Sequence, residues 1–256
     1  MAEPFAGEKY MKAMIFCAGL GTRFKPWTDN QPKALALVNE KSLLQRNIEY
    51  LQSNGINDVV INVHHFPGKI EEAIKKNNGW GSQVAISDER NELLETGGGL
   101  LKAKHYFTAG ERFITCNVDI LTDLDINNLL AFHEKNKPLI SFAVTNRKTS
   151  RYLLLDEKNR LCGWRNTRTN EERMVISSLL KDDGVCQEKA YSCVVVFEYE
   201  IFRLMEENNF SGKFSLIDVY LQLAAKHQIL GYDHSGDKLV DVGKTESIPI
   251  AESFFI

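Results

Sequence analysis

The sequence predicts an α/β fold: a doubly wound, Rossmann-like, mainly parallel sheet with a small antiparallel insertion in its second half. In the first half, short apolar segments alternate with segments whose apolar residues recur at helical spacing. This alternation favours parallel strands, because a helix can carry the chain back to the start of the next strand. After Thr145, strand-like segments follow one another closely and are joined by turn residues, which favours antiparallel pairs.

The first half contains five predicted strands and four predicted helices, each justified by its own pattern. The strands are the apolar segments 13–18, 59–63, 83–87, 113–117 and 139–144. The helices are the segments with 3.6-residue spacing, 43–51, 68–76, 98–104 and 126–136. Ser42 is the expected N-cap of the first helix, because its hydroxyl can accept a hydrogen bond from a free backbone N–H.

The second half predicts a different arrangement of strands and helices. Its strands are expected at 152–155, 160–164, 190–197, 229–232 and 239–242, and its helices at 199–207, 215–227 and from residue 245. Because no internal repeat or low-complexity linker occurs, residues 11–256 are expected to form a single domain after a loose tail at 1–10. Within this domain, residues 11–145 are the part with alternating strands and helices, and residues 146–256 are the part with the antiparallel insertion.

Composition excludes several classes of protein. The net charge of −3 argues against a general nucleic-acid binder, which needs an extended cationic surface. The five cysteines form no C-x-x-C pair and are expected to be free thiols in a reducing compartment. No apolar run is long enough to span a membrane. We therefore expect a cytoplasmic protein, a monomer or homodimer, without a membrane or nucleic-acid partner.

A glycine-rich loop follows the first predicted strand, with Gly19, Gly21 and Arg23 near its start and Lys33 further on. Glycines let backbone N–H groups approach an anion, and the two cations can neutralise a polyphosphate. The spacing is that of neither the P-loop nor the dinucleotide-binding loop. A tight turn without any ligand is the simpler alternative for the glycines taken alone.

Beyond the glycines, the loop continues with Pro26, Thr28, Pro32 and Lys33 in a fixed order. On these residues the chain resembles the sugar-1-phosphate nucleotidyltransferases, whose signature is G-x-G-x-R-x-x-P-x-T followed by P-K. The resemblance implies transfer of a nucleotidyl group from a nucleoside triphosphate to a sugar 1-phosphate, with Mg²⁺ and release of pyrophosphate. It also implies that residues 11–145 bind the nucleotide and residues 146–256 the sugar phosphate.

Two aspartates end predicted strands, Asp119 after Cys116-Asn117-Val118 and Asp241 before Val242-Gly243. Locally, each can be a helix cap or a turn residue. The resemblance implies instead that both bind Mg²⁺, that Asn117 faces the sugar phosphate, and that Arg23, Lys33 and Asp119 are catalytic. Ligands of open α/β sheets bind at the carboxyl ends of strands, where these residues are expected.

The nucleotide-binding residues implied by the resemblance come from the glycine loop and two later segments. They are Ala18, Gly19, Leu20, Gly21, Thr22, Arg23, Lys33, Ser87, Gly97 and Gly98. Glycines 97 and 98 belong to Leu94-Glu95-Thr96-Gly97-Gly98-Gly99, where Thr96 can also cap a helix. This form is similar to that of the N-acetylmuramic acid 1-phosphate uridylyltransferases, which favours UTP and an N-acetylated amino sugar.

The second half is expected to hold the sugar phosphate. Arg147, Lys148, Arg151 and Arg165 make it locally basic, although any one of them can equally be a solvated cation. The predicted sugar-phosphate residues are Asn117, Arg151, Trp164 and Tyr191. The two aromatic rings can stack on a sugar face or simply belong to the core.

Three residues depart from the family pattern. These departures affect the expected identity of the sugar more than the expected reaction. Val118 and Cys193 stand where the family often has glycine, and Lys244 replaces the threonine of D-V-G-T. Two other functions remain open: a mannose-1-phosphate guanylyltransferase, and a non-catalytic sensor that binds nucleotide sugars. Retention of Arg23, Lys33 and both aspartates argues against the sensor.

Overall fold

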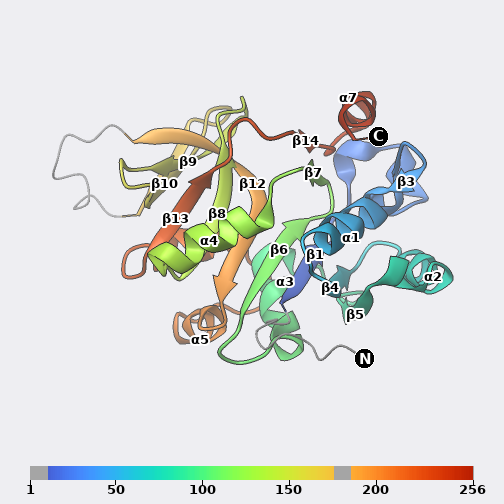
Figure 1. Cartoon of the computed structure of the whole chain (residues 1–256), viewed down its shortest axis with the longest axis horizontal. Helices are drawn as coiled ribbons and strands as arrows, with labels where there is room; N and C mark the ends of the chain where they lie inside the picture. Colours follow the sequence, from blue (N-terminus) through green and yellow to red (C-terminus); the bar gives the residue numbers. More distant parts are fainter. Residues whose placement is uncertain (1–10, 176–185, 256) are drawn as a thin grey trace, which may run out of the picture.

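A ten-stranded mixed sheet forms the centre of the molecule in the computed structural model, which describes residues 11–175 and 186–255. Its strands are β1 Lys12–Phe16, β4 Asp58–Val63, β5 Gln83–Asp88, β6 Arg112–Asn117, β8 Ile140–Thr145, β9 Arg151–Leu155, β10 Leu161–Asn166, β11 Glu171–Met174, β12 Gln187–Glu198 and β13 Ile229–Asp233. The order along the main path is β11-β10-β9-β12-β6-β1-β4-β5, with β8 beside β12 and β13 beside β8 (Figure 1).

Four of the five first-half strands pair in parallel with one another, as predicted, whereas β8 pairs with none of them and lies antiparallel to β12. β1 pairs in parallel with β4 on one side and β6 on the other, and β4 pairs in parallel with β5. The change of direction comes at β12, which runs antiparallel to β6, β8 and β9. Antiparallel pairing therefore reaches the middle of the sheet, and β10 and β11 extend it to the edge.

Helices cover both faces of the sheet, which confirms the doubly wound fold. The helices are α1 Leu43–Ser53, α2 Pro67–Lys76, α3 Glu95–Lys102, α4 Ile126–Asn136, α5 Ile201–Glu207, α6 Leu216–Leu223 and α7 Ile248–Phe254. Apolar residues of α1, α2, α4 and α7 share one core with Ala13 and Ile15 of β1. Residues of α3, α5 and α6 share the other core with Met14 and Phe16, because successive strand residues face opposite sides.

Most predicted elements are confirmed, with shifts of a few residues at their ends. Ser42 caps α1, since its Oγ accepts a hydrogen bond of 3.1 Å from the backbone N–H of Gln45. The last predicted helix divides into a 3₁₀ turn, Thr245–Ser247, followed by α7. The prediction missed β11 and three of the four very short strands that form two separate pairs; the fourth corresponds to the strand predicted at 239–242. The predicted tail at 1–10 lies outside the described residues.

One of these short pairs positions the site. β7 Ile120–Thr122 and β14 Leu239–Asp241 form a separate antiparallel ribbon in which Ile120 lies opposite Asp241. The other pair, β2 Leu37–Val38 and β3 Lys41–Ser42, precedes α1. Within the described ranges, no helix is both long enough and apolar enough to cross a membrane.

Candidate active site

A cavity of about 330 Å³ opens at the carboxyl ends of β1, β4 and β6. Because β4 and β6 leave β1 on opposite sides, this is the point where the winding of the sheet changes direction and ligands of such folds bind. The cavity is lined by Phe16, Cys17, Ala18, Gly19, Lys33, Ala34, Asn62, Leu93, Glu95, Thr96, Asn117, Val118, Asp119 and Ser215.

The two glycines of the loop after β1 have different roles. Gly21 has a φ of +61°, and a Cβ on it would lie 2.8 Å from Cγ2 of Thr28. The Thr28 hydroxyl also donates a 2.9 Å hydrogen bond to the Gly21 carbonyl, so the fold itself requires glycine here. A Cβ on Gly19, by contrast, would meet no described atom within 4 Å. The backbone of Gly19 is thus open to the cavity.

Lys33 and Asp119 form an ion pair inside the cavity. Their side chains are only 12% and 15% exposed, so this pair is better shielded from solvent than an ordinary surface ion pair. Lys33 begins a 3₁₀ turn directly after Pro32, whereas Asp119 follows β6. The loop and the strand end that the sequence predicted as catalytic therefore meet.

Asp241 and Arg23 complete the same edge of the sheet. The backbone N–H of Val242 donates a 2.8 Å hydrogen bond to the carbonyl of Asp119, which joins the two aspartate segments. A Cβ on Gly243 would lie 2.5 Å from Nη2 of Arg23 and 2.6 Å from Oδ1 of Asp241, so both groups lie over that glycine. Oδ1 of Asp241 is buried and has no hydrogen-bond partner among the described residues.

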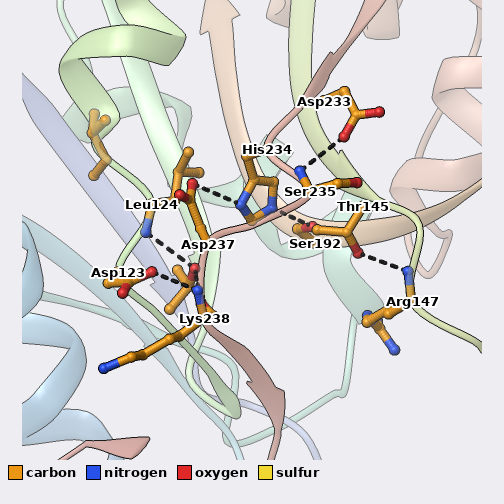
Figure 2. Close-up of polar contacts among 12 residues, drawn as sticks. Asp123, Leu124, Thr145, Arg147, Ser192, Asp233, His234, Ser235, Asp237 and Lys238 are labelled. Carbon is orange, nitrogen blue, oxygen red and sulfur yellow. Dashed lines mark hydrogen bonds and ion pairs between the residues drawn. The ribbon is translucent and has the colours of Figure 1, made fainter.

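A buried polar network holds the connection that leads from β13 to Asp241 (Figure 2). The His234 ring lies 2.8 Å from the hydroxyl of Ser192 at Nε2 and 3.3 Å from a carboxylate oxygen of Asp237 at Nδ1. Burial lowers the pKa of His234, so the neutral ring donates its Nδ1 proton to Asp237 and accepts from Ser192. Further along, the backbone N–H of Lys238 donates to Asp123, just after β7.

The cysteines near the cavity are not poised as nucleophiles. Burial raises the pKa of the Cys17 thiol well above its ordinary value, and the charge of Asp119 adds to this effect. Burial likewise raises the pKa of Cys116 to about 12. Both groups therefore remain protonated thiols at neutral pH.

Comparison with known proteins identifies the family. Residues 12–158 match the family described as Nucleotidyl transferase. The chain belongs to this family. The nucleotidyl transferase chain is similar in fold to the solved structure of HddC from Yersinia pseudotuberculosis, with a TM-score of 0.75 and 21% sequence identity. The match covers 96% of this chain and 100% of HddC. This likeness concerns the fold, and it confirms the predicted Rossmann-like type.

Curated relatives match only in part. The N-acetylmuramate alpha-1-phosphate uridylyltransferase of Caulobacter vibrioides is 38% identical over 109 residues, 42% of this chain and 45% of that protein. The mannose-1-phosphate guanylyltransferase catalytic subunit beta of Dictyostelium discoideum is 33% identical over 127 residues, 49% of this chain and 35% of that protein. The nucleotidyl transferase chain thus spans less than half of the length of these two relatives.

The structure brings together six of the twelve residues predicted for the nucleotide and the metal, along with Asn117, which is predicted for the sugar phosphate. Ala18, Gly19, Lys33, Asn117 and Asp119 line the cavity, and Arg23 and Asp241 meet at Gly243 beside it. Leu20 and Thr22 lie on the exposed outer side of the loop and do not line the cavity. The roles assigned to these residues stay predictions.

Ser87, Gly97 and Gly98, which the sequence predicts as nucleotide-binding, do not line the cavity. Ser87 ends up 2% exposed near the end of β5 and does not line the cavity. The backbone N–H groups of Gly97 and Gly98 both donate to the carbonyl of Phe214, at 2.9 and 3.2 Å. A Cβ on Gly98 would lie 2.1 Å from the Gly212 carbonyl oxygen. These glycines therefore serve close packing of α3, while Glu95 and Thr96 of the same loop face the cavity.

The predicted sugar-phosphate residues of the second half are scattered. Arg151 is exposed at the start of β9. The ring of Trp164 stacks with the guanidinium of Arg173, 5.0 Å from its centroid. Tyr191 packs edge-on against Phe142, and its hydroxyl lies 3.1 Å from that of Tyr220. None of these side chains lines the cavity, and the Tyr191 ring packs against the core, so their roles toward the sugar phosphate stay predictions.

Among the polar residues that line the cavity, Asn62 and Ser215 are not predicted as site residues from the sequence. Asn62 accepts a 2.8 Å hydrogen bond from the backbone N–H of Cys17 and donates a 2.7 Å bond to the buried carboxylate of Glu89. A polar residue at the end of an otherwise apolar strand was the available signal for Asn62. Ser215 caps α6, and only the packing of α6 against α3 brings it to the cavity.

Proposed function

We propose that this chain transfers a nucleotidyl group from a nucleoside triphosphate to a sugar 1-phosphate and releases pyrophosphate. One observation carries the proposal: Arg23, Lys33, Asp119 and Asp241 meet at one edge of the sheet, beside a cavity at the winding switch. Family membership supports it, and so do the activities for which both relatives are named. Because the match covers only part of those relatives, the activity is a proposal for this chain.

The reaction needs positioning and charge stabilisation more than proton transfer. The attacking group is an oxygen of the sugar phosphate, which is already ionised near neutral pH, so no strong general base is required. Arg23 would hold the phosphates that leave, and Lys33 those near the reacting phosphorus. Lys33 lies in the shielded cavity and Arg23 is exposed beside it, and cations that face developing negative charge are a recognised solution for phosphoryl transfer.

The two carboxylates fit a Mg²⁺ ion. Asp119 and Asp241 supply hard oxygen ligands, and the partnerless Oδ1 of Asp241 is a buried acceptor available for a cation. The described residues contain no group of three or more histidine, cysteine or acidic side chains around one metal position. This agrees with Mg²⁺, which usually keeps waters and takes further oxygens from phosphate. When bound, it would supply charge neutralisation for the phosphate groups.

For the substrates, we propose UTP and the 1-phosphate of an N-acetylated amino sugar such as N-acetylmuramic acid. The support is the L-E-T-G-G-G loop and the identity with the Caulobacter uridylyltransferase. The Dictyostelium relative supports a second candidate, GTP with mannose 1-phosphate.

Pyrophosphate release tests this proposal directly. The purified chain is assayed with ATP, CTP, GTP and UTP against a panel of hexose and N-acetylated amino-sugar 1-phosphates, with Mg²⁺. The expected result is turnover with one preferred pair, which EDTA abolishes and Asp119→Ala does not show. Tight nucleotide binding without turnover on any pair would instead favour a non-catalytic sensor and overturn the proposal.

A further inference from the structure

The four basic residues of the second half have different environments in the folded chain. Lys148 and Arg151 are exposed. Arg165 makes ion pairs with Glu172 at 2.6 Å and Glu188 at 2.5 Å, near the exposed edge of the sheet. Only Arg147 is partly buried without an ion pair to an acidic side chain of the described residues. It is therefore the basic residue of this group that can receive a buried anion.

Arg147 is held in place by its own contacts. Its backbone N–H donates to the Thr145 hydroxyl at 3.4 Å, and its Nη2 donates to the Tyr191 carbonyl at 3.1 Å (Figure 2 shows its place beside Thr145 and Ser192). Its Nε is buried and has no acceptor among the described residues. A buried, charged N–H group without an acceptor is destabilising, and an anionic ligand would compensate this cost.

Arg147 follows β8, and the strand that it contacts through the Tyr191 carbonyl is β12, which passes the carboxyl end of β6. Val194 of β12 pairs with Cys116 of β6, so residues of β12 before Val194 lie beyond that end, where Asn117 and Asp119 follow. Between Tyr191 and Val195 the register of β12 against β8 shifts, and Cys193 has a φ of +57°. This bulge turns the segment around Cys193 out of the regular ladder.

The charges that act on the Cys193 thiol agree with a position of Arg147 near Asp119 and Asp241. Burial raises the pKa of its thiol, Asp119 and Asp241 raise it further, and Arg147 lowers it. The Cys193 side chain is thus within electrostatic range of both candidate metal carboxylates and of Arg147. Arg147 does not line the cavity itself, but its contact with the Tyr191 carbonyl keeps it on the β8–β12 side of the site, whereas Arg23 and Lys33 belong to the loop after β1.

We propose that Arg147 binds the phosphate group of the sugar 1-phosphate. This inference rests on the proposed function, because it assigns the second substrate to one face of that site. A guanidinium suits a phosphate monoester because its planar N–H groups can contact two oxygens at once. One cation for the incoming phosphate and two for the triphosphate would keep the two anions apart until they react.

Steady-state kinetics of Arg147→Gln and Arg147→Lys test the inference, with Lys148→Gln as the matched control on the neighbouring exposed cation. In Arg147→Gln we expect KM for the sugar 1-phosphate to rise about 10- to 100-fold, as for the loss of a charge-assisted hydrogen bond. The KM for the nucleoside triphosphate should stay within about twofold. Arg147→Lys should recover part of the loss, and Lys148→Gln should resemble the wild type.

Two outcomes would overturn the inference. If Arg147→Gln raises both KM values equally, or only lowers the melting temperature, Arg147 merely supports the β12 bulge. If Arg147→Gln is poorly folded, Arg147→Lys, which keeps the positive charge, decides between the two roles by the same comparison of the two KM values. Failure of the proposed function is distinct, because the wild-type chain would then show no turnover with any pair.

Discussion

The two halves of the sheet build their share of the site in different ways. In the parallel half, β1, β4 and β6 all end at the same edge, so residues directly after each strand meet in one cavity. In the antiparallel half, a residue's place depends on strand register and on the bulge of β12. This explains why the motif residues of the first half lie together, whereas Arg151, Trp164 and Tyr191 do not.

The glycines show the same contrast on a smaller scale. Gly19 lines the cavity and has free space at its Cβ position, while Gly98 is enclosed by the backbone around Gly212. Both belong to glycine-rich loops that the sequence predicts as nucleotide-binding. A glycine therefore marks a close approach of the backbone, but only the fold decides whether a ligand or another segment approaches.

The largest expected effect is that of Asp119→Ala, which removes one proposed metal ligand and the partner of Lys33 together. Pyrophosphate release should fall by at least about 10³-fold. Circular dichroism should show an intact fold, because Asp119 lies at a strand end and not in the core. Near-wild-type turnover would refute the metal assignment and, with it, the view that the parallel half carries the chemistry.

Lys33→Ala should have the next largest effect. Loss of one electrostatic donor to the reacting phosphates corresponds to about 2.7–4 kcal/mol, or about 10²–10³-fold in kcat. Lys25, which lies in the same loop and pairs with Asp29 at the surface, is the matched control as Lys25→Ala. Equal losses in the two variants would mean that general positive charge, and not the position of Lys33, matters.

A pair of glycine substitutions sharpens the comparison of the two loops. Gly98→Ala should lower the free energy of unfolding by about 1–3 kcal/mol, because its Cβ would collide with backbone. Gly19→Ala should leave stability unchanged and raise KM for the nucleoside triphosphate on the order of tenfold. Urea unfolding measures the stability of both variants, and steady-state kinetics measure their KM values. A raised KM in Gly98→Ala together with a loss of stability only in Gly19→Ala would contradict the proposed place of the nucleotide.

The smallest expected effect is a dependence of stability on pH. Burial lowers the pKa of His234 below its ordinary value of 6.5, so the unfolded chain binds the proton first as the pH falls. The free energy of unfolding should therefore decrease below pH 6.5, by at most about 1.4 kcal/mol per pH unit, until the pH passes the folded pKa. His133, whose pKa burial also lowers, contributes in the same direction.

His234→Gln should reduce this slope, because glutamine does not titrate. His105→Gln, at an exposed position, is the control and should leave the slope unchanged. Glu89, in the first half, has the opposite sign: burial raises its pKa, so its contribution is lost as the pH rises from 4.5 through the folded value. A wild-type slope in His234→Gln would show that the buried network does not carry the acid sensitivity.

The sequence by itself determined the order of strands and helices, the parallel first half, and the residues after β1 and β6. These features depend on local properties: apolar periodicity, a capping serine and polar residues at strand ends. The tertiary structure alone brought Asp241 beside Asp119 through the β7–β14 pair. It also distinguished Arg147 from the other three basic residues and placed the Tyr191 ring in the core. The physical reason is that strand register, bulges and burial arise from contacts between residues far apart in the chain, which no local pattern encodes.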